Sequence, residues 1–301
     1  MNFRTALPLA VVLTKSQLRG TQRSRFLARL VSNPQSIIIL DVLFVIIFGV
    51  TGYFIISSIP QDLAETFGRL EIEALIGIPA ITTFMLILFG VLSELSQPIQ
   101  STSTDLVNWL PISPSEYVVG STISLSYTYS IILAFFLGIA LGPAAYFGHG
   151  LIFVMSAIMG SVSLLIGSAA VELLRAVTNR ISSSFYRKSG RSGIFVRLSL
   201  TITAFVLFQL LFSGRVMVTL LNGLTQTVAA VWYVPVMWPS LAVQTLSKAF
   251  DFTPLGYGLL SLGFVGVLFG VAIGMRRAYW VPVPVSIRLS TQPYRVFPAE
   301  W

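Results

Sequence analysis

Residues 109–120 have the sequence WLPISPSEYVVG, a polar, proline-broken junction between two long apolar runs. Ser113 is a favoured N-cap residue, Pro114 suits the first helical position, and Glu116 follows the cap by three residues. Together they predict a capping box, in which the cap and the glutamate each satisfy a backbone N–H group of the other. A helix is therefore predicted to begin at Pro114, at the start of the second apolar run.

The residues just before this junction predict a second feature. Residues 101–110 place Leu106, Trp109 and Leu110 on one face and hydroxyl side chains elsewhere. This pattern is typical of a short helix that lies along a membrane surface. Such a helix is accessible to a partner outside the bilayer, which can press on it and move the helix that follows.

The composition excludes a soluble domain. Of the 301 residues, 55% are hydrophobic and 10% are charged, and the mean hydropathy is +0.84. A membrane-spanning helix needs roughly 20 mostly apolar residues; five runs meet that need clearly, and a sixth is interrupted by Ser213, Gly214 and Arg215. The six predicted spans are residues 37–59, 74–92, 117–141, 151–173, 198–221 and 255–275. We therefore predict an all-α polytopic membrane protein with a single transmembrane domain, residues 37–275.

Residues 228–246 are apolar enough for a seventh span, but Pro235 and Pro239 would break its helix and Trp232 favours an interface. We expect a re-entrant or interfacial segment here, before the last span. With six spans and the N-terminus inside, nearly all Lys and Arg residues fall on the cytoplasmic side, whereas a seventh span would move the C-terminal ones outside. The prediction is a multi-pass protein of the cell membrane with both termini cytoplasmic.

Both ends of the chain are basic. Residues 1–36 combine apolar positions with a basic row at Lys15, Arg19 and Arg23, which predicts an amphipathic helix on the membrane surface. Residues 276–301 contain several prolines and predict an extended cytoplasmic tail. Basic residues that meet anionic lipid account for the net charge of +8, so membrane lipid rather than nucleic acid is the expected partner.

The chain lacks the motifs of common enzymes. It has no GxxxxGK[ST] loop, so we expect no ATPase activity of its own. It has no cysteine and a single histidine, His149, which excludes thiolate metal sites and histidine clusters. We predict no enzymatic activity, no cofactor and no metal, and we assign His149 no role. The first outer loop is predicted to be acidic, with Asp62, Glu65, Glu71 and Glu73.

Three further acidic residues lie inside predicted spans or at their ends. Asp41 lies within about a turn and a half of the start of the first span, where water reaches it and the helix dipole favours a carboxylate. Glu94 and Glu172 lie at the inner ends of other spans. Intramembrane ionisable groups are functional candidates, but we favour an interfacial position for all three over proton or ion coupling.

The third predicted span is rich in hydroxyl side chains. Thr122, Ser126 and Ser130 recur every four residues and are a possible lining of a transport pathway, although such residues more often let helices pack and hydrogen-bond. Glycines at the same spacing predict close helix contacts, within this chain or between subunits. These glycines are Gly138 and Gly142 in the third span and Gly266, Gly270 and Gly274 in the last.

With these features in place, nearly the whole chain resembles the permease subunits of ABC-2 type transporters. The shared features are the basic amphipathic leader, the six spans, the interfacial segment before the last span and, above all, the junction. The family pattern L-P-[IV]-S-x-x-E-[YIL]-x-x-G is matched by Leu110, Pro111, Ile112, Ser113, Glu116, Tyr117 and Gly120. Ser121 departs from the family, in which a lysine or arginine often follows the motif glycine.

The resemblance implies that residues 101–110 form a coupling helix, within a coupling segment of about residues 93–116, that docks on a nucleotide-binding subunit. It also implies a surface connecting helix at residues 14–30 and outer re-entrant helices at residues 228–246. The implied coupling residues are Ser101, Asp105, Leu106, Trp109, Leu110, Pro111, Ser113 and Glu116.

By the same resemblance, the chain is the transmembrane subunit of an exporter that moves an unidentified substrate by alternating access. A separate ATP-binding cassette subunit would drive it, and a second permease subunit, identical or homologous, would complete it. Two alternatives stay open. One is an ion-coupled secondary transporter or channel that acts alone and uses Asp41, and the other is a membrane anchor for an ATPase that transports nothing.

Overall fold

The computed structural model describes residues 8–13, 34–96, 113–188, 202, 228, 232–248 and 251–279. These residues form helices and short connections, and none of them lies in a β-strand. Several predicted elements lie outside the described residues: the surface helix at 14–30, the coupling helix at 101–110, the tail beyond 279 and, apart from Ile202, the span at 198–221.

Five of the described helices are long and apolar enough to cross a membrane, and they correspond to five of the six predicted spans. They are α3 (Pro34–Ser57), α4 (Gln61–Ser96), α6 (Pro114–Phe147), α7 (Gly150–Lys188) and α11 (Thr253–Tyr279). The predicted all-helical character is confirmed for this part of the chain. The number of six spans stays a prediction.

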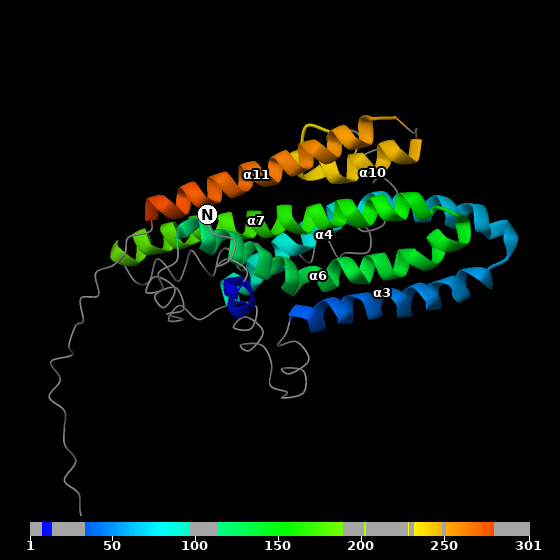
Figure 1. The fold of residues 1–301 in the computed structure, drawn as a ribbon, viewed down its shortest axis with the longest axis horizontal. Helices are drawn as coiled ribbons and strands as arrows, with labels where there is room; N and C mark the ends of the chain where they lie inside the picture. Colours follow the sequence, from blue (N-terminus) through cyan, green and yellow to red (C-terminus); the bar gives the residue numbers. More distant parts are fainter. Residues whose placement is uncertain are drawn as a thin grey trace, which may run out of the picture.

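These five helices lie side by side (Figure 1). At one end of the bundle α3 and α6 begin and α4, α7 and α11 end; we call it the basic end, because Arg175, Arg276 and Arg277 lie there. The opposite end holds the α3–α4 connection at residues 58–60 and the α6–α7 connection at residues 148–149, and we call it the turn end.

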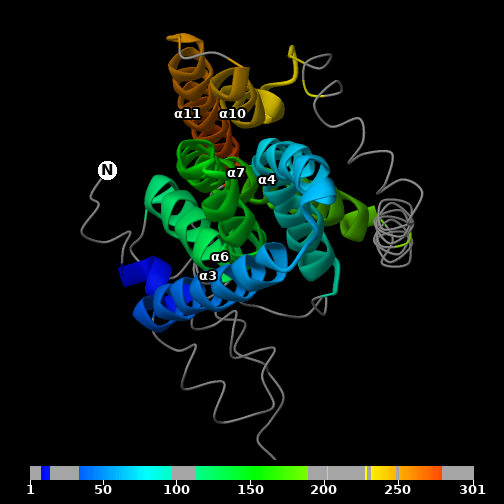
Figure 2. The ribbon, with the colours of Figure 1, turned by 90° about the vertical axis from the view of Figure 1, so that its right-hand side faces the viewer.

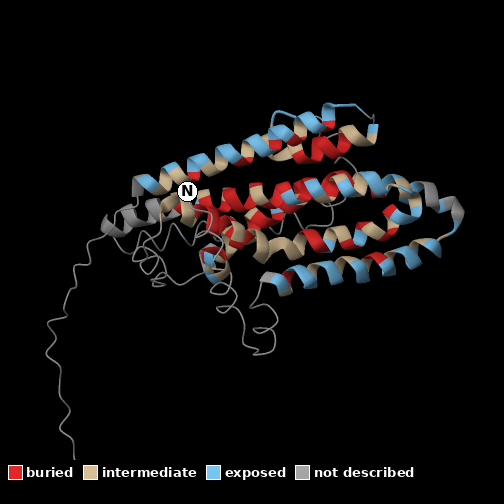
Figure 3. Cartoon of the chain, viewed as in Figure 1, coloured by how far each residue is buried: buried red, intermediate tan, exposed pale blue. Residues whose placement is uncertain are grey.

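Seen along the bundle, α3 lies at one edge beside α6, α4 and α7 lie in the middle, and α10 (Trp238–Lys248) and α11 lie at the other edge (Figure 2). Buried residues gather on α4, α6 and α7, whereas α3 and α11 expose large apolar side chains along much of their length (Figure 3). Apolar faces of this kind are stable against lipid but costly against water.

A close backbone contact joins α3 to α6. A Cβ atom on Gly142 would lie 2.3 Å from the backbone N of Tyr53 and 2.5 Å from the carbonyl oxygen of Gly49, so only glycine fits there. Gly138 also faces α3 closely, and the predicted contact at these two glycines is confirmed. By contrast, no described atom lies within 4 Å of such a Cβ on the last-span glycines, Gly266, Gly270 and Gly274.

The α4 helix is longer than the span predicted for it. It begins at Gln61, so the four acidic residues assigned to an outer loop are helical, and that prediction was wrong. Pro79 lies in the middle of α4 and has no N–H to donate to the carbonyl oxygen of Leu75. That oxygen instead accepts a 2.8 Å hydrogen bond from Ser156 Oγ of α7. The carbonyl oxygen that Pro79 leaves without a helical donor is therefore satisfied by a hydroxyl from a neighbouring helix.

The α10 helix packs against α4 beside the same proline. The backbone N–H of Ala80, next to Pro79, donates to Ser240 Oγ of α10 over 3.1 Å. A 3₁₀ helix, η1 (Pro235–Met237), precedes α10, and Pro235 and Pro239 lie in the first turns of these two helices, where proline is tolerated. With 11 residues, α10 is about 16 Å long, whereas a span needs about 30 Å. The described part of residues 228–246 is therefore too short to be a seventh span.

Candidate functional site

The start of α6 has the capping box that the sequence predicts. Ser113 has extended backbone angles (φ −73°, ψ 150°), its Oγ accepts a hydrogen bond from the N–H of Glu116 over 3.3 Å, and its own N–H donates to Glu116 Oε2 over 3.0 Å. Pro114 occupies the first helical turn. Both backbone donors are satisfied within one turn, so the first residue of α6 is firmly defined.

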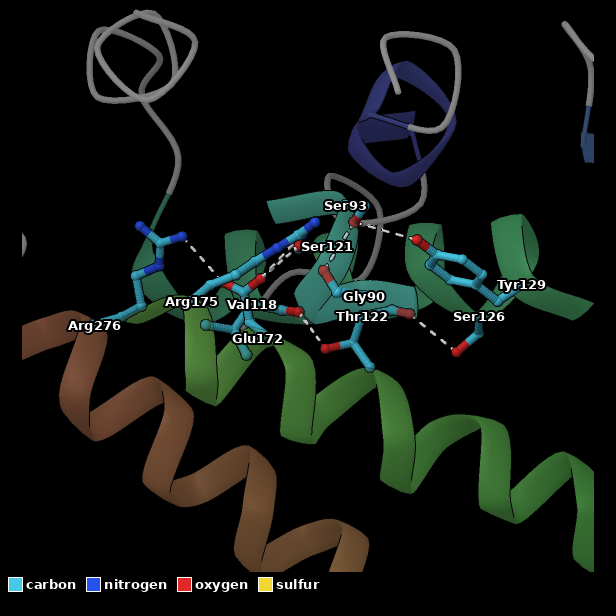
Figure 4. Close-up of polar contacts among 10 residues, drawn as sticks. All are labelled: Gly90, Ser93, Val118, Ser121, Thr122, Ser126, Tyr129, Glu172, Arg175 and Arg276. Carbon is cyan, nitrogen blue, oxygen red and sulfur yellow. Dashed lines mark hydrogen bonds and ion pairs between the residues drawn. The ribbon is translucent and has the colours of Figure 1, made fainter. Parts of the chain in front are cut away.

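Just inside this cap, a cluster of charged side chains joins α6 to α7 and α11 (Figure 4). Glu172 of α7 is fully buried. Its Oε2 accepts a 2.8 Å hydrogen bond from Ser121 Oγ of α6, and its Oε1 accepts a 3.0 Å hydrogen bond from Arg276 Nη2 of α11. Arg175, one turn further along α7, lies 3.8 Å from Oε2. We call these four residues the Glu172 cluster.

The cluster is anchored to the first turn of α6 by an aromatic ring. The guanidinium carbon of Arg276 lies 4.2 Å from the centre of the Tyr117 ring, a cation–π contact. Tyr117 lies next to the capping residue Glu116. The first turn of α6 is therefore in direct contact with Arg276 of α11.

The electrostatics make this cluster costly to disturb. Glu172 is 0% exposed, and the side chains of Arg175 and Arg276 are only 10% and 13% exposed. Burying a charge is expensive unless it is paired and hydrogen-bonded, and removing one partner leaves the other uncompensated. One carboxylate faces two guanidinium groups here, so Arg175 of α7 and Arg276 of α11 both depend on Glu172 for a counter-charge.

The structure corrects the expectation for Glu172 in part, because the residue lies near the basic end but its side chain is buried in the protein rather than exposed to water. The sequence places Glu172 near the end of a span, where a water-exposed carboxylate is the ordinary case. Its two arginine partners, one of them 104 positions away in the chain, make full burial stable instead. The neighbouring basic residues Arg276 and Arg277 at the end of the last span were the available signal, because a buried carboxylate needs a cation near the same end.

The three hydroxyl residues of the possible pathway make contacts with different helices. Thr122 is fully buried and donates to the carbonyl oxygen of Val118 in its own helix. Ser126 Oγ lies 2.9 Å from Ser168 Oγ of α7, and Ser130 Oγ donates to Asp41 Oδ2 of α3 over 2.5 Å. The Ser126 and Ser130 hydroxyls thus join α6 to neighbouring helices and the Thr122 hydroxyl bonds within α6, and a role of the three as a pathway stays a prediction.

Asp41 is part-buried between α3 and α6. Besides the oxygen that accepts from Ser130, its Oδ1 is buried and has no hydrogen-bond partner among the described residues. An interfacial carboxylate open to water was expected here, so the structure corrects that expectation in part. Asp41 lies seven residues after Pro34, about two helical turns from the start of α3 at the basic end.

The turn end has its own acidic contact, which the sequence did not indicate. Glu71 of α4 has a side chain only 3% exposed, and its Oε2 lies 2.5 Å from Nδ1 of His149, the residue between α6 and α7. Gly148 before it has φ +77°, a left-handed conformation that favours glycine and turns the chain into α7. His149 thus ties the α6–α7 connection to α4, although we had assigned it no role.

Of the predicted coupling residues, the structure describes only Ser113 and Glu116. The remaining six lie outside the described residues: Ser101, Asp105, Leu106, Trp109, Leu110 and Pro111. In the described part of the chain, no three His, Cys, Asp or Glu side chains come together as a metal site requires. No protein-family model, curated protein or solved structure matches the chain. The function proposed below therefore rests on the residues and their contacts.

Proposed function

We propose that the chain is the transmembrane subunit of an ABC-2 type exporter. It moves an unidentified substrate across the cell membrane by alternating access, driven by a separate ATP-binding cassette subunit and completed by a second permease subunit. The observation that carries the proposal is the capping box at Ser113, which fixes the start of α6 shortly after the predicted coupling helix at residues 101–110. A firmly defined helix start lets a movement of the coupling helix, which lies outside the bilayer, be transmitted to α6.

The Glu172 cluster supports this proposal, because it supplies the next step of the transmission. Tyr117 and Ser121 lie in the first two turns of α6, and both contact the cluster. A push on the coupling segment thus acts on α6 and, through Glu172 and Arg276, on α7 and α11. Packed helices linked by discrete polar contacts respond to such a push as switching elements rather than by gradual deformation.

The proposal also assigns an orientation. Basic residues favour the cytoplasmic side, and Arg175, Arg276 and Arg277 lie at the basic end. The basic end is then cytoplasmic and the turn end faces outward. The α10 helix, whose Ser240 accepts a hydrogen bond from the Ala80 N–H of α4, is then an outer re-entrant helix. With residues 198–221 as a further span, both termini are cytoplasmic.

The proposal is tested by copurification. The chain is expressed with a candidate ATP-binding cassette subunit, reconstituted in lipid nanodiscs, and assayed for a stoichiometric complex that hydrolyses ATP. We expect the variant Leu106→Asp/Trp109→Asp to lose the complex, because it places charge on the apolar face of the predicted coupling helix. The matched control is Thr104→Asp/Asn108→Asp, which adds the same two charges to the polar face and should retain the complex. Loss in both variants, or in neither, contradicts the coupling role.

A second candidate is an ion-coupled transporter that acts alone, and Asp41 is the observation in its favour. A buried carboxylate oxygen without a described partner is a natural site for a proton. The test is ion or proton flux in liposomes that contain the purified chain and no ATPase. Flux that is lost in Asp41→Asn and retained in Ser130→Ala would replace the exporter proposal, whereas the absence of flux in the unmodified chain leaves the exporter as the function.

A further inference from the structure

The contacts of α6 with α4 and α7 change character along its length. Toward the turn end they are apolar: the Leu133 side chain lies where a Cβ on Gly160 of α7 would be, only 2.5 Å from that position. Leu133, Ala140 and Ala144 belong to one buried apolar cluster with residues of α4 and α7, and Leu125 is the one member of that cluster from the first half of α6. The His149–Glu71 contact closes the same end. This half of the interface is tightly packed.

Toward the basic end, the same interface is crossed by hydrogen bonds between side chains. Ser121 donates to Glu172, and Ser126 Oγ lies 2.9 Å from Ser168 Oγ. Further along, the hydroxyl of Tyr129 lies 3.3 Å from Ser93 Oγ of α4 (Figure 4). All three contacts lie on the basic-end side of Leu133. We call this half of the interface, lined by these six side chains, the polar seam.

The two halves differ in what separation costs. Apolar surfaces that part in contact with water lose the hydrophobic contribution in proportion to the area exposed. Hydroxyl groups that part can exchange their partner for water, because a hydrogen bond to water replaces the one that is lost. The polar seam is therefore the half that separates most readily if water reaches it.

The position of the seam favours entry of water from the basic end. Its outermost contact is the Glu172 cluster, whose three charged groups gain hydration when water approaches. The helix on one side of the seam is α6, whose first turn carries the capping box. On the other side, α4 and α7 are held together by close packing, with Val171 filling the position of a Cβ on Gly90 and Leu86 facing Gly167.

We propose that the polar seam opens at the basic end and forms a hydroxyl-lined vestibule that admits water and polar solutes between α6 and the α4–α7 pair. The apolar half of the interface, at Leu133 and Gly160, is the pivot. The vestibule lies within one chain, not between two subunits. It rests on the proposed function for the lever that moves α6, but its existence is a property of this chain and is tested on the chain alone.

The test uses cysteine accessibility, for which the natural chain is an ideal background because it has no cysteine. Single-cysteine variants are embedded in vesicles with the basic end outward, and a charged, membrane-impermeant methanethiosulfonate reagent is added. Modification is followed by intact-mass spectrometry. The key variant is Ser168→Cys, a fully buried seam residue on α7. Ser126→Cys reports from the α6 side.

Two controls separate an opening seam from general loosening. Ala169→Cys lies at the same depth on α7 and is equally buried, but on a different face of the helix. Ser156→Cys replaces another fully buried serine on α7, one whose hydroxyl bonds to α4 toward the turn end. If modification follows transient opening, the cysteine at position 168, which is as fully buried as both controls, should react at least about tenfold faster than they do. Rates at Ser168→Cys no higher than at Ala169→Cys overturn the proposal.

A second arm adds the ATP-binding cassette subunit and nucleotide. A nucleotide-dependent change in the rate at Ser168→Cys supports both the vestibule and the exporter. Fast modification of the chain alone with no response to the ATPase or nucleotide supports the vestibule and contradicts the exporter. A functional complex in which the seam cysteines react as slowly as the controls overturns the vestibule and leaves the exporter in place.

Discussion

Removal of the Glu172 carboxylate should destabilise the helical bundle by about 3–5 kcal/mol, because two arginines then remain buried without their counter-charge. The variant is Glu172→Gln, which keeps the shape of the side chain and removes only its charge. Glu172 is fully buried, so neither water nor screening by salt replaces the lost charge. The main loss is expected in the link between α7 and α11.

The expected magnitude follows from the distances. Charges 3.0 and 3.8 Å apart, as for Arg276 and Arg175 against Glu172, attract by about 5.5 and about 4.4 kcal/mol at an effective dielectric constant near 20. The cost of burying the three ions offsets most of that attraction in the intact cluster. Neutralising Glu172 removes the attraction but retains the burial cost of both arginines, so a large part of the attraction appears as lost stability.

The assay is reversible unfolding in mixed micelles of increasing SDS content, combined with a double-mutant cycle. Glu172→Gln, Arg276→Met and the matched control Arg277→Met are each measured alone, and Glu172→Gln is then combined with each arginine variant in turn. Arg277 is the next residue and is exposed. We expect a coupling energy above about 1.5 kcal/mol for the pair with Arg276 and below about 0.5 kcal/mol for the pair with Arg277. Equal coupling to both arginines would refute the assignment of Arg276 as the buried partner.

Two further predictions use the same unfolding assay. Gly142→Val should destabilise the bundle by about 1–3 kcal/mol or more, because its side chain would overlap the backbone of α3, whereas Gly270→Val, with no described atom near its added Cβ, should cost less than about 1 kcal/mol; similar losses in both would contradict the α3–α6 contact. Ser240→Ala should cost about 1 kcal/mol by leaving the Ala80 N–H without its partner, and Ser247→Ala, whose hydroxyl bonds within α10, should cost less than about 0.5 kcal/mol. A Ser240→Ala variant as stable as Ser247→Ala would show that the hydrogen bond between Ala80 and Ser240 does not hold α10 against α4.

The features that could be predicted from the sequence are those that depend on neighbouring residues. The capping box needs only Ser113, Pro114 and Glu116 in the right order, and it is present. The five described spans follow from the length of apolar runs, which the thickness of a bilayer imposes directly. Likewise, Pro235 and Pro239 limit the helices in their segment because their effect on the backbone is local.

The features that could not be predicted depend on residues far apart in the chain. The acidic start of α4 resembled a loop exposed to water. The burial of Glu71 within it depends on a contact with His149, which lies 78 positions later in the chain. Glu172 resembled a water-exposed residue because its partner Arg276 lies 104 positions away in the chain. A carboxylate near the end of a span has two stable states, exposed to water or buried with a cation, and the choice depends on which helix packs beside it. Single-sequence periodicity carries no information on that packing.

Ser121 is the position at which the chain departs from the ABC-2 pattern that it resembles, and its contacts give a physical reason for a serine there. A lysine or arginine often follows the motif glycine in that family, whereas here Ser121 Oγ donates to Glu172 Oε2 and the cation on Oε1 comes from Arg276 of α11. A basic side chain at position 121 would bring a third cation against a single buried carboxylate and raise the net charge of the cluster from +1 to +2, which burial makes costly. Serine keeps the hydrogen bond between α6 and α7 and leaves the counter-charge to α11. The carboxylate thereby links three helices instead of two, and it does so about two helical turns from the capped start of α6. Under the proposed function, a displacement of that start would act on α7 and α11 through the same side chain.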